Sequence, residues 1–137
     1  MYVLDTNVIS ELRQGKSNPS AAVRAWASDK PAHHLFLSAI SILELEKGVM
    51  AWERLTPPQG SALRIWLNGV KAGFAGRILP ITENTATLCA ALHVPDPKSE
   101  RDAMIAATAL EHRMTVVTRN TADFAGTGIA LVDPFES

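Results

Sequence analysis

The chain has 137 residues, of which 47% are hydrophobic and 20% are charged, and its formal net charge is −1. This length is typical of one compact domain, so we expect a single domain spanning residues 1–137. The near-neutral charge excludes a polybasic protein that binds nucleic acid through bulk charge, and leaves room only for a local basic patch.

The sequence also lacks the features of membrane and disulfide-rich proteins. No apolar run approaches the roughly 18–20 residues that span a bilayer, and the first residues show no basic segment followed by a long apolar one, as a signal peptide would. Cys89 is the single cysteine, which excludes an internal disulfide framework and a multi-cysteine zinc site. We therefore expect a soluble cytoplasmic domain without a membrane partner.

Short apolar runs alternate with segments of helical periodicity along the chain. The runs are continuous in their apolar character, which predicts strands buried on both faces of a parallel sheet. Five strands are predicted, at residues 2–4, 35–37, 77–81, 115–118 and 129–132. Pro80 removes a backbone donor from the third strand, so that strand should lie at an edge of the sheet.

Six helices are predicted between these strands, at residues 6–13, 18–28, 40–53, 61–74, 83–93 and 99–113. Asn18 is the expected N-cap of the second helix, with Pro19 in its first turn. Pro57 and Pro58 should break the chain before the fourth helix, and two prolines should keep residues 94–98 in a loop. This alternation predicts a three-layer α/β/α domain with a mostly parallel sheet.

Four carboxylates occupy positions that a parallel sheet brings to one edge. Asp5 ends the first strand, Glu44 lies in the helix after the second, Asp102 lies in the first turn of the sixth helix, and Asp123 follows the fourth strand. Ligands of open parallel sheets bind outside the carboxyl ends of the strands, so these acids are the candidate catalytic residues. The sequence has no G-x-S-x-G motif, Walker A loop or H-x-x-x-H zinc pair.

Each acid also has an ordinary structural interpretation. Asp5 can cap the following helix, Asp102 can close a helix start in an S-x-x-D pattern, and Asp123 can be a turn residue. Glu44 is harder to explain in this way, because Gly48, one turn later, costs the helix roughly 1 kcal/mol relative to alanine and leaves open space beside the acid. The hypothesis of an acidic site therefore rests on the joint position of the four residues.

Four carboxylates at one edge repel one another. Two unit charges about 4 Å apart cost about 4 kcal/mol at an effective dielectric constant near 20, so protonation or a bound cation must relieve the repulsion. Ligands that are all carboxylates favour Mg²⁺ or Mn²⁺ over zinc. Such an ion can activate a water for in-line attack on a phosphate and shield the charge that develops at phosphorus.

One segment of the chain is locally basic. Residues 47–77 contain five basic residues, one acid and three large aromatic residues, namely Lys47, Arg54, Arg64, Lys71 and Arg77, Glu53, and Trp52, Trp66 and Phe74. We interpret this segment either as a solvated face over aromatic core residues or as a patch for phosphates or an acidic partner.

Four segments resemble the motifs of PIN-domain nucleases and follow one another in the same order. They are VLDTNVISEL (3–12), SAISILELEKGV (38–49), RDAMIAATALEH (101–112) and TVVTRNTADF (115–124). The sequence is most similar to the VapC-type toxins of bacterial toxin–antitoxin pairs, in their FitB-like branch. One segment alone would be weak evidence, but the four together span nearly the whole chain.

The resemblance implies a five-stranded parallel sheet in the order 3-2-1-4-5 and Mg²⁺-dependent endoribonuclease activity, with Mn²⁺ able to substitute. It implies that Asp5 and Asp102 are the main metal ligands and that Glu44 and Asp123 complete the acidic site. The supporting polar residues would be Thr6, Asn7, Thr118 and Asn120. The implied substrate is structured RNA such as tRNA or rRNA, whose cleavage inhibits translation. The implied partners are a second copy in a homodimer and a VapB-type antitoxin.

Three alternatives have less support in the sequence. A catalytically silent PIN-like binding module would usually have lost an acid, and all four are present. An aspartyl-phosphate phosphatase or phosphoacceptor domain needs a second acid at D-x-D spacing or a distant lysine, whereas Asn7 stands at the D-x-D position. A DNA nuclease of the same superfamily would need longer helical insertions than this chain allows.

Overall fold

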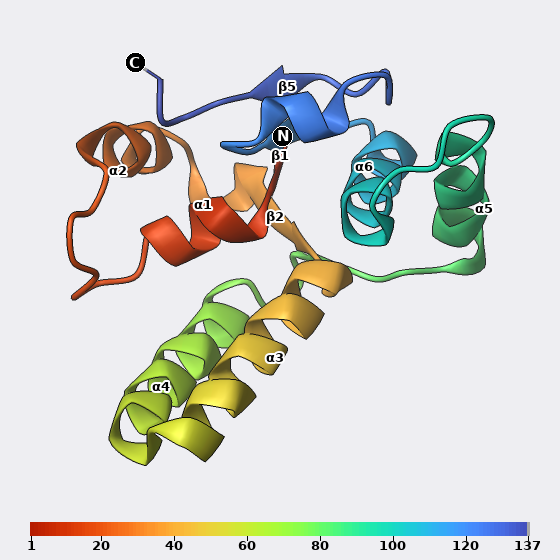
Figure 1. Cartoon of the computed structure of the whole chain (residues 1–137). Coiled ribbons are helices and arrows are strands. Elements are labelled where there is room, and N and C mark those ends of the chain that lie inside the picture. Colours follow the sequence, from red (N-terminus) through yellow and green to blue (C-terminus); the bar gives the residue numbers. More distant parts are fainter. Residues whose placement is uncertain (137) are drawn as a thin grey trace.

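The structure, a computed structural model, describes residues 1–136 and is built around one parallel sheet (Figure 1). The five strands are β1 (Tyr2–Leu4), β2 (Leu35–Ser38), β3 (Ile78–Leu79), β4 (Thr115–Val117) and β5 (Leu131–Val132). Their spatial order is β3-β2-β1-β4-β5, and each neighbouring pair is parallel. The predicted sheet order is therefore confirmed, and β3 lies at an edge, as expected from Pro80.

Within residues 1–136, six α-helices and two 3₁₀ helices connect the strands. They are α1 (Thr6–Glu11), α2 (Ala21–Ser28), η1 (Ala32–His34), α3 (Ala39–Leu55), α4 (Pro57–Gly73), α5 (Glu83–Leu92), α6 (Glu100–His112) and η2 (Thr121–Phe124). No helix in this described part of the chain has both the length and the apolar character needed to cross a bilayer.

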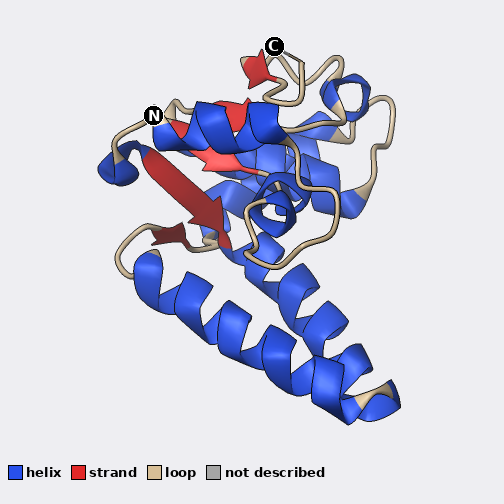
Figure 2. Ribbon diagram, turned by 90° about the vertical axis from the view of Figure 1, so that its left-hand side faces the viewer, coloured by secondary structure: helices blue, strands red, loops and turns tan. Residues whose placement is uncertain are grey.

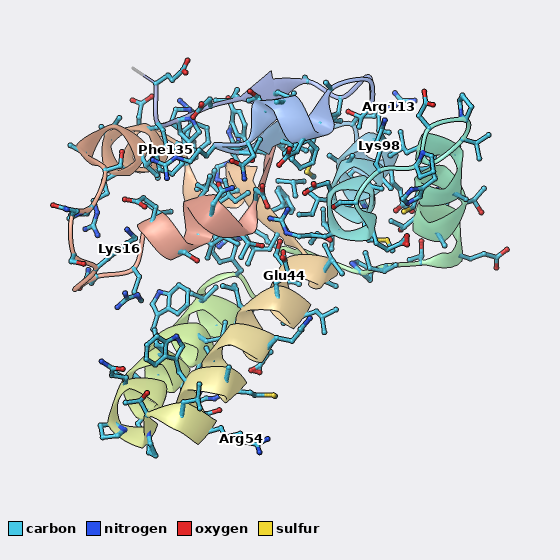
Figure 3. The ribbon with its side chains drawn as sticks, viewed as in Figure 1. Lys16, Glu44, Arg54, Lys98, Arg113 and Phe135 are labelled. Carbon is cyan, nitrogen blue, oxygen red and sulfur yellow. The ribbon has the colours of Figure 1, made fainter. Side chains whose placement is uncertain are left out.

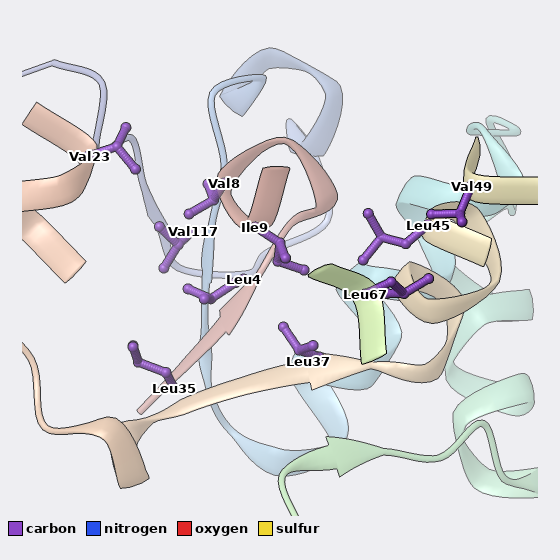
Figure 4. Packing of buried hydrophobic residues seen from close by; sticks show 10 residues of the cluster. All are labelled: Leu4, Val8, Ile9, Val23, Leu35, Leu37, Leu45, Val49, Leu67 and Val117. Carbon is purple, nitrogen blue, oxygen red and sulfur yellow. The ribbon is translucent and has the colours of Figure 1, made fainter. Parts of the chain in front are cut away.

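Successive side chains of β1 and β4 point to opposite faces of the sheet and so divide the core into two halves. Leu4 and Val117 pack against α1, α2 and the α3–α4 pair, as Figure 4 shows. Val3 and Val116 point to the opposite face and pack against α6. All four side chains are fully buried. The sheet is thus covered by helices on both faces, which confirms the three-layer arrangement.

Helices α3 and α4 form a hairpin that projects from the body of the protein (Figures 1 and 2). Thr56 alone separates them, and Pro57 and Pro58 occupy the first turn of α4. The predicted helix start at residue 61 is therefore wrong, because proline is tolerated in a first turn, where its missing N–H has no helical partner. Gly60 allows the two helices to approach closely, since a Cβ atom there would overlap the backbone of Glu53.

Gly60→Ala should destabilise the protein by about 1–3 kcal/mol, because the added methyl group pushes the two helices apart. Gly69→Ala is the matched control in the same helix, because a Cβ atom added there would have no neighbour within 4 Å. It should be neutral or raise the free energy of unfolding by up to about 1 kcal/mol. Urea unfolding measures both variants, and equal stability would contradict the close approach at Gly60.

The second helix begins later than predicted. Ser20 is the N-cap of α2, and its hydroxyl oxygen accepts a hydrogen bond from the Val23 N–H at 3.2 Å. Asn18 has a left-handed backbone with φ of +52°, which is incompatible with the extended conformation of an N-cap. Glu11 accepts a hydrogen bond from the Ser20 N–H at 2.6 Å, so the end of α1 holds the start of α2 in place.

Candidate active site

Three of the four predicted acids meet at the carboxyl end of the sheet. Asp5 follows β1, Glu44 lies in the second turn of α3, and Asp102 lies in the first turn of α6. The guanidinium of Arg101 contacts all three: its Nη2 lies 2.5 Å from Asp5 Oδ1, its Nε contacts Glu44, and its Nη1 contacts Asp102. Figure 3 shows Glu44 at the base of the hairpin, where α3 joins the body.

Asp5 is fully buried and is surrounded by hydrogen-bond donors. Its Oδ1 accepts from the Thr6 N–H at 2.7 Å, and its Oδ2 accepts from the Thr118 hydroxyl at 2.7 Å and the Asn7 amide at 3.2 Å. These donors replace the water that burial removes, because a buried carboxylate without partners would be strongly destabilising. Three of the four expected supporting residues thus contact Asp5 directly.

Glu44 and Asp102 are held in different ways. The Thr6 hydroxyl donates to Glu44 Oε1 at 2.7 Å, so one threonine connects Asp5 with Glu44. At the start of α6 the cap is Ser99, whose hydroxyl oxygen accepts from the Asp102 backbone N–H at 3.1 Å. The carboxylate of Asp102 contacts Arg101 instead, so capping does not account for this side chain. Asp5, in contrast, both caps α1 and belongs to the cluster.

Arg101 carries the positive charge of the cluster. Burial lowers its pKa, but the negative charges of Asp5, Glu44 and Asp102 outweigh this effect, so its pKa is raised above the ordinary value. The guanidinium therefore stays charged, and it neutralises one of the three carboxylates. Sequence reasoning did not single out Arg101 as functional. The signal in the sequence is that Arg101, a basic residue, stands directly before Asp102, an expected metal ligand.

Asp123 and Asn120 follow β4, the strand next to β1, but the structure does not bring their side chains into the cluster. Asp123 is exposed on η2, and within residues 1–136 its carboxylate makes no hydrogen bond or ion pair. Asn120 joins the site only through its backbone, whose N–H donates to the Thr118 hydroxyl oxygen at 3.0 Å. The catalytic role of Asp123 and the supporting role of Asn120 stay predictions.

Three of the five basic side chains in residues 47–77 bind carboxylates or carbonyl groups of the protein itself. Arg64 pairs with Glu46 and Glu53, Lys71 pairs with Glu46, and Arg77 donates to the carbonyls of Ala32, Leu35 and Gly73. Lys47 and Arg54 are exposed and make no ion pair within the described residues. Fewer basic side chains of this segment are therefore available to bind phosphates than its composition suggests.

An apolar groove lies between the end of α1 and the hairpin. It consists of two adjoining hollows of about 410 and 450 Å³, which share Gln14, Ala62 and Trp66 in their walls. Ile65, in one wall, is 74% exposed, and Trp52, in the other, is 46% exposed. Large apolar side chains exposed together are typical of an interaction surface.

A second group of potential metal ligands lies between α5 and α6. One donor atom each of Cys89, His93 and Glu100 lies within 4.8 Å of the others. The Lys98 N–H donates to His93 Nδ1 at 3.1 Å, so the neutral imidazole keeps its proton on Nε2, which lies 3.2 Å from Glu100 Oε1. With its proton in place, Nε2 has no lone pair to offer a metal ion. Burial raises the pKa of the Cys89 thiol, which disfavours the thiolate that would bind a metal. Cys89 is a buried core residue, as expected.

Comparison with known proteins assigns the family. Residues 2–129 match the sequence model described as "PIN domain". The chain belongs to the PIN-domain family. The VapC ribonuclease Y4jK of Sinorhizobium fredii is 37% identical over 99% of both chains. Toxin FitB of Neisseria gonorrhoeae is 35% identical over 98% of this chain and 99% of that one.

Two solved structures have the same fold as this chain. FitAcB from Neisseria gonorrhoeae superposes with a TM-score of 0.91 at 34% identity, over the full length of both chains. A toxin–antitoxin complex from Klebsiella pneumoniae superposes with a TM-score of 0.72 at 28% identity, again over both full lengths. The resemblance found in the four sequence motifs is therefore confirmed at the level of family and fold.

Proposed function

We propose that this chain is a divalent-metal-dependent endoribonuclease that acts as the toxin of a toxin–antitoxin pair. The observation that carries the proposal is the convergence of Asp5, Glu44 and Asp102 on one cation at the carboxyl end of a PIN-type sheet. Full-length relatives named as a VapC ribonuclease and as Toxin FitB support it. In this proposal the substrate is structured RNA, such as tRNA or rRNA, and its cleavage in the cytoplasm inhibits translation.

The residues of the site fit Mg²⁺, with Mn²⁺ as a substitute. Asp5, Glu44 and Asp102 offer only carboxylate oxygens, which are the ligands that these ions prefer. They would hold the ion with the oxygens that now contact Arg101. When bound, the ion supplies an activated water and shields the charge that develops on the phosphate.

The acidic side chains of the site differ in the number of hydrogen bonds that hold them. Asp5 is fixed, because backbone, hydroxyl and amide groups all donate to it. Asp102 has no side-chain partner other than Arg101 within residues 1–136, so fewer contacts hold it than hold Asp5. Glu44 has 28% of its side chain exposed and marks the side from which an RNA phosphate would approach. Asp123, exposed on η2, would complete the acidic edge.

An antitoxin of the VapB type is the proposed partner, and a homodimer is the proposed assembly. The structural neighbour from Klebsiella pneumoniae is a toxin–antitoxin complex. The apolar groove beside the hairpin offers a surface on which a segment of such a partner could bind. Binding there would cover Trp52 and Ile65, which are exposed in the isolated chain.

Cleavage of RNA by the purified chain tests this function. With Mg²⁺ or Mn²⁺ the chain should cut structured RNA and leave 5′-phosphate and 3′-hydroxyl ends, and EDTA should stop the reaction. The protein encoded beside this gene, added in equal amount, should also stop it. Products with 2′,3′-cyclic phosphates would contradict the proposal, because they require attack by the 2′-hydroxyl of the RNA. A chain that binds its neighbour but cuts no RNA would instead be a silent binding module.

A further inference from the structure

Arg101 places three different nitrogen atoms on three different acids. Its Nη2 contacts Asp5 Oδ1, its Nε contacts Glu44 Oε2, and its Nη1 contacts Asp102 Oδ1. The second oxygens of Asp5 and Glu44 accept hydrogen bonds from threonine hydroxyls. Arg101 therefore binds one oxygen of each of the three carboxylates, and in Asp5 and Glu44 a threonine binds the other oxygen.

These contacts make the guanidinium and a divalent ion competitors for the same carboxylate oxygens. An ion between the three carboxylates would bind the same oxygens that the N–H groups of Arg101 contact, and two cations at contact distance repel each other. Arg101 neutralises one of three negative charges, whereas a divalent ion neutralises two. The exchange of Arg101 for an ion therefore improves the charge balance of Asp5, Glu44 and Asp102.

Arg101 can leave the site without disturbing the helix that carries it. Its side chain is 30% exposed, so it has a path to water. The start of α6 is closed by Ser99, whose hydroxyl binds the backbone N–H of Asp102. The position of the guanidinium is therefore independent of the helix cap, and side-chain rotation is enough to release the three acids.

We infer that Arg101 is an exchangeable internal cation, which holds Asp5, Glu44 and Asp102 together in the metal-free protein and competes with the divalent ion for them. It is a positioning residue in this role, because it acts on the acids and not on the RNA. The competition lowers the apparent affinity for the ion, so the nuclease site fills only when the ion concentration exceeds a threshold set by Arg101. The inference rests on the proposed metal dependence.

Binding of Mn²⁺ to the whole chain, followed by the electron paramagnetic resonance signal of the free ion, tests the competition. Arg101→Met keeps an unbranched apolar stem but removes the charge and the donors of the guanidinium, so it should bind Mn²⁺ at least about tenfold more tightly than the wild type. Arg101→Lys restores a competing charge and should stay within about threefold of the wild type. In EDTA, Arg101→Met should melt at a lower temperature, and Mn²⁺ should raise its Tm more than that of the wild type.

Arg64→Met is the matched control. Arg64 also pairs with two carboxylates and has a similar exposed fraction, 26%, but it lies in the hairpin with Glu46 and Glu53. Its loss should lower the Tm and leave the affinity for Mn²⁺ unchanged. Arg101→Gln, which has no charge and retains an N–H donor, provides the same comparison if the methionine variant does not fold.

The outcomes separate this inference from the proposed function. Equal affinity of the wild type and Arg101→Met for Mn²⁺ would overturn the competition and leave the metal-dependent nuclease in place. Weaker binding by Arg101→Met would also overturn it, since Arg101 would then assist the ion. Absence of binding by both proteins would overturn the proposed metal dependence itself. Binding by Arg101→Met alone would support the inference in its strongest form.

Discussion

Asp102→Asn should lower the rate of RNA cleavage by roughly 100-fold or more and leave the fold intact. Asp102 directs one carboxylate oxygen to the centre of the site, where it contacts Arg101. The amide has the same shape, but it removes one negative charge from the three that would hold the ion. The water and the RNA phosphate would then lose their alignment.

The stability of Asp102→Asn should differ from that of the wild type by less than about 1 kcal/mol. The variant loses an ion pair with the partly exposed Arg101, and it also loses the repulsion between Asp102 and its two neighbouring acids. The cap of α6 is unaffected, because Ser99 binds the backbone of residue 102. Asp29→Asn, at an exposed acid paired with Lys30, is the control for cleavage assays and urea unfolding. A fully active Asp102→Asn variant would contradict the catalytic role of Asp102.

Asp5→Asn should both inactivate the protein and destabilise it by about 2–4 kcal/mol. Asp5 is fully buried, and its neighbours are all donors: the Thr6 N–H, the Thr118 hydroxyl, the Asn7 amide and Arg101. An asparagine replaces one acceptor oxygen with an NH₂ group, so donors would face donors in a place that water cannot reach. Thermal and urea unfolding measure this loss.

Asp123→Asn is the matched variant for Asp5→Asn. Asp123 is exposed, and its carboxylate has no partner within residues 1–136, so its loss should change stability by no more than about 0.5 kcal/mol. Its effect on cleavage tests whether Asp123 completes the acidic edge. Equal stability of the Asp5 and Asp123 variants would contradict the role of Asp5 as a buried acceptor.

The central strands could be predicted from the sequence because their side chains are buried on both faces. Val3 and Leu4 alternate between the two halves of the core and still read as one apolar run. The edge strands β3 and β5 are shorter than the sequence predicts. Each has a partner on one side only, so the paired segment is shorter than the apolar run that contains it.

The positions of the acids could be predicted better than the contacts between them. Asp5 follows a central strand and Asp102 begins a helix, so chain order alone brings both to one edge of a parallel sheet. The contact of Arg101 with three acids depends on how β1, α3 and α6 are arranged in space, which no local pattern contains. The pairing of Arg64 with Glu46 and Glu53 was missed for the same reason, since α3 and α4 come together only in the fold.

Crystals soaked in Mn²⁺ test most directly whether Asp5, Glu44 and Asp102 hold a divalent ion. The predicted result is an anomalous difference peak between the three carboxylates, with the guanidinium of Arg101 turned away from them. A map at saturating Mn²⁺ in which that place has no peak, and Arg101 still contacts all three acids, would contradict the proposed metal site.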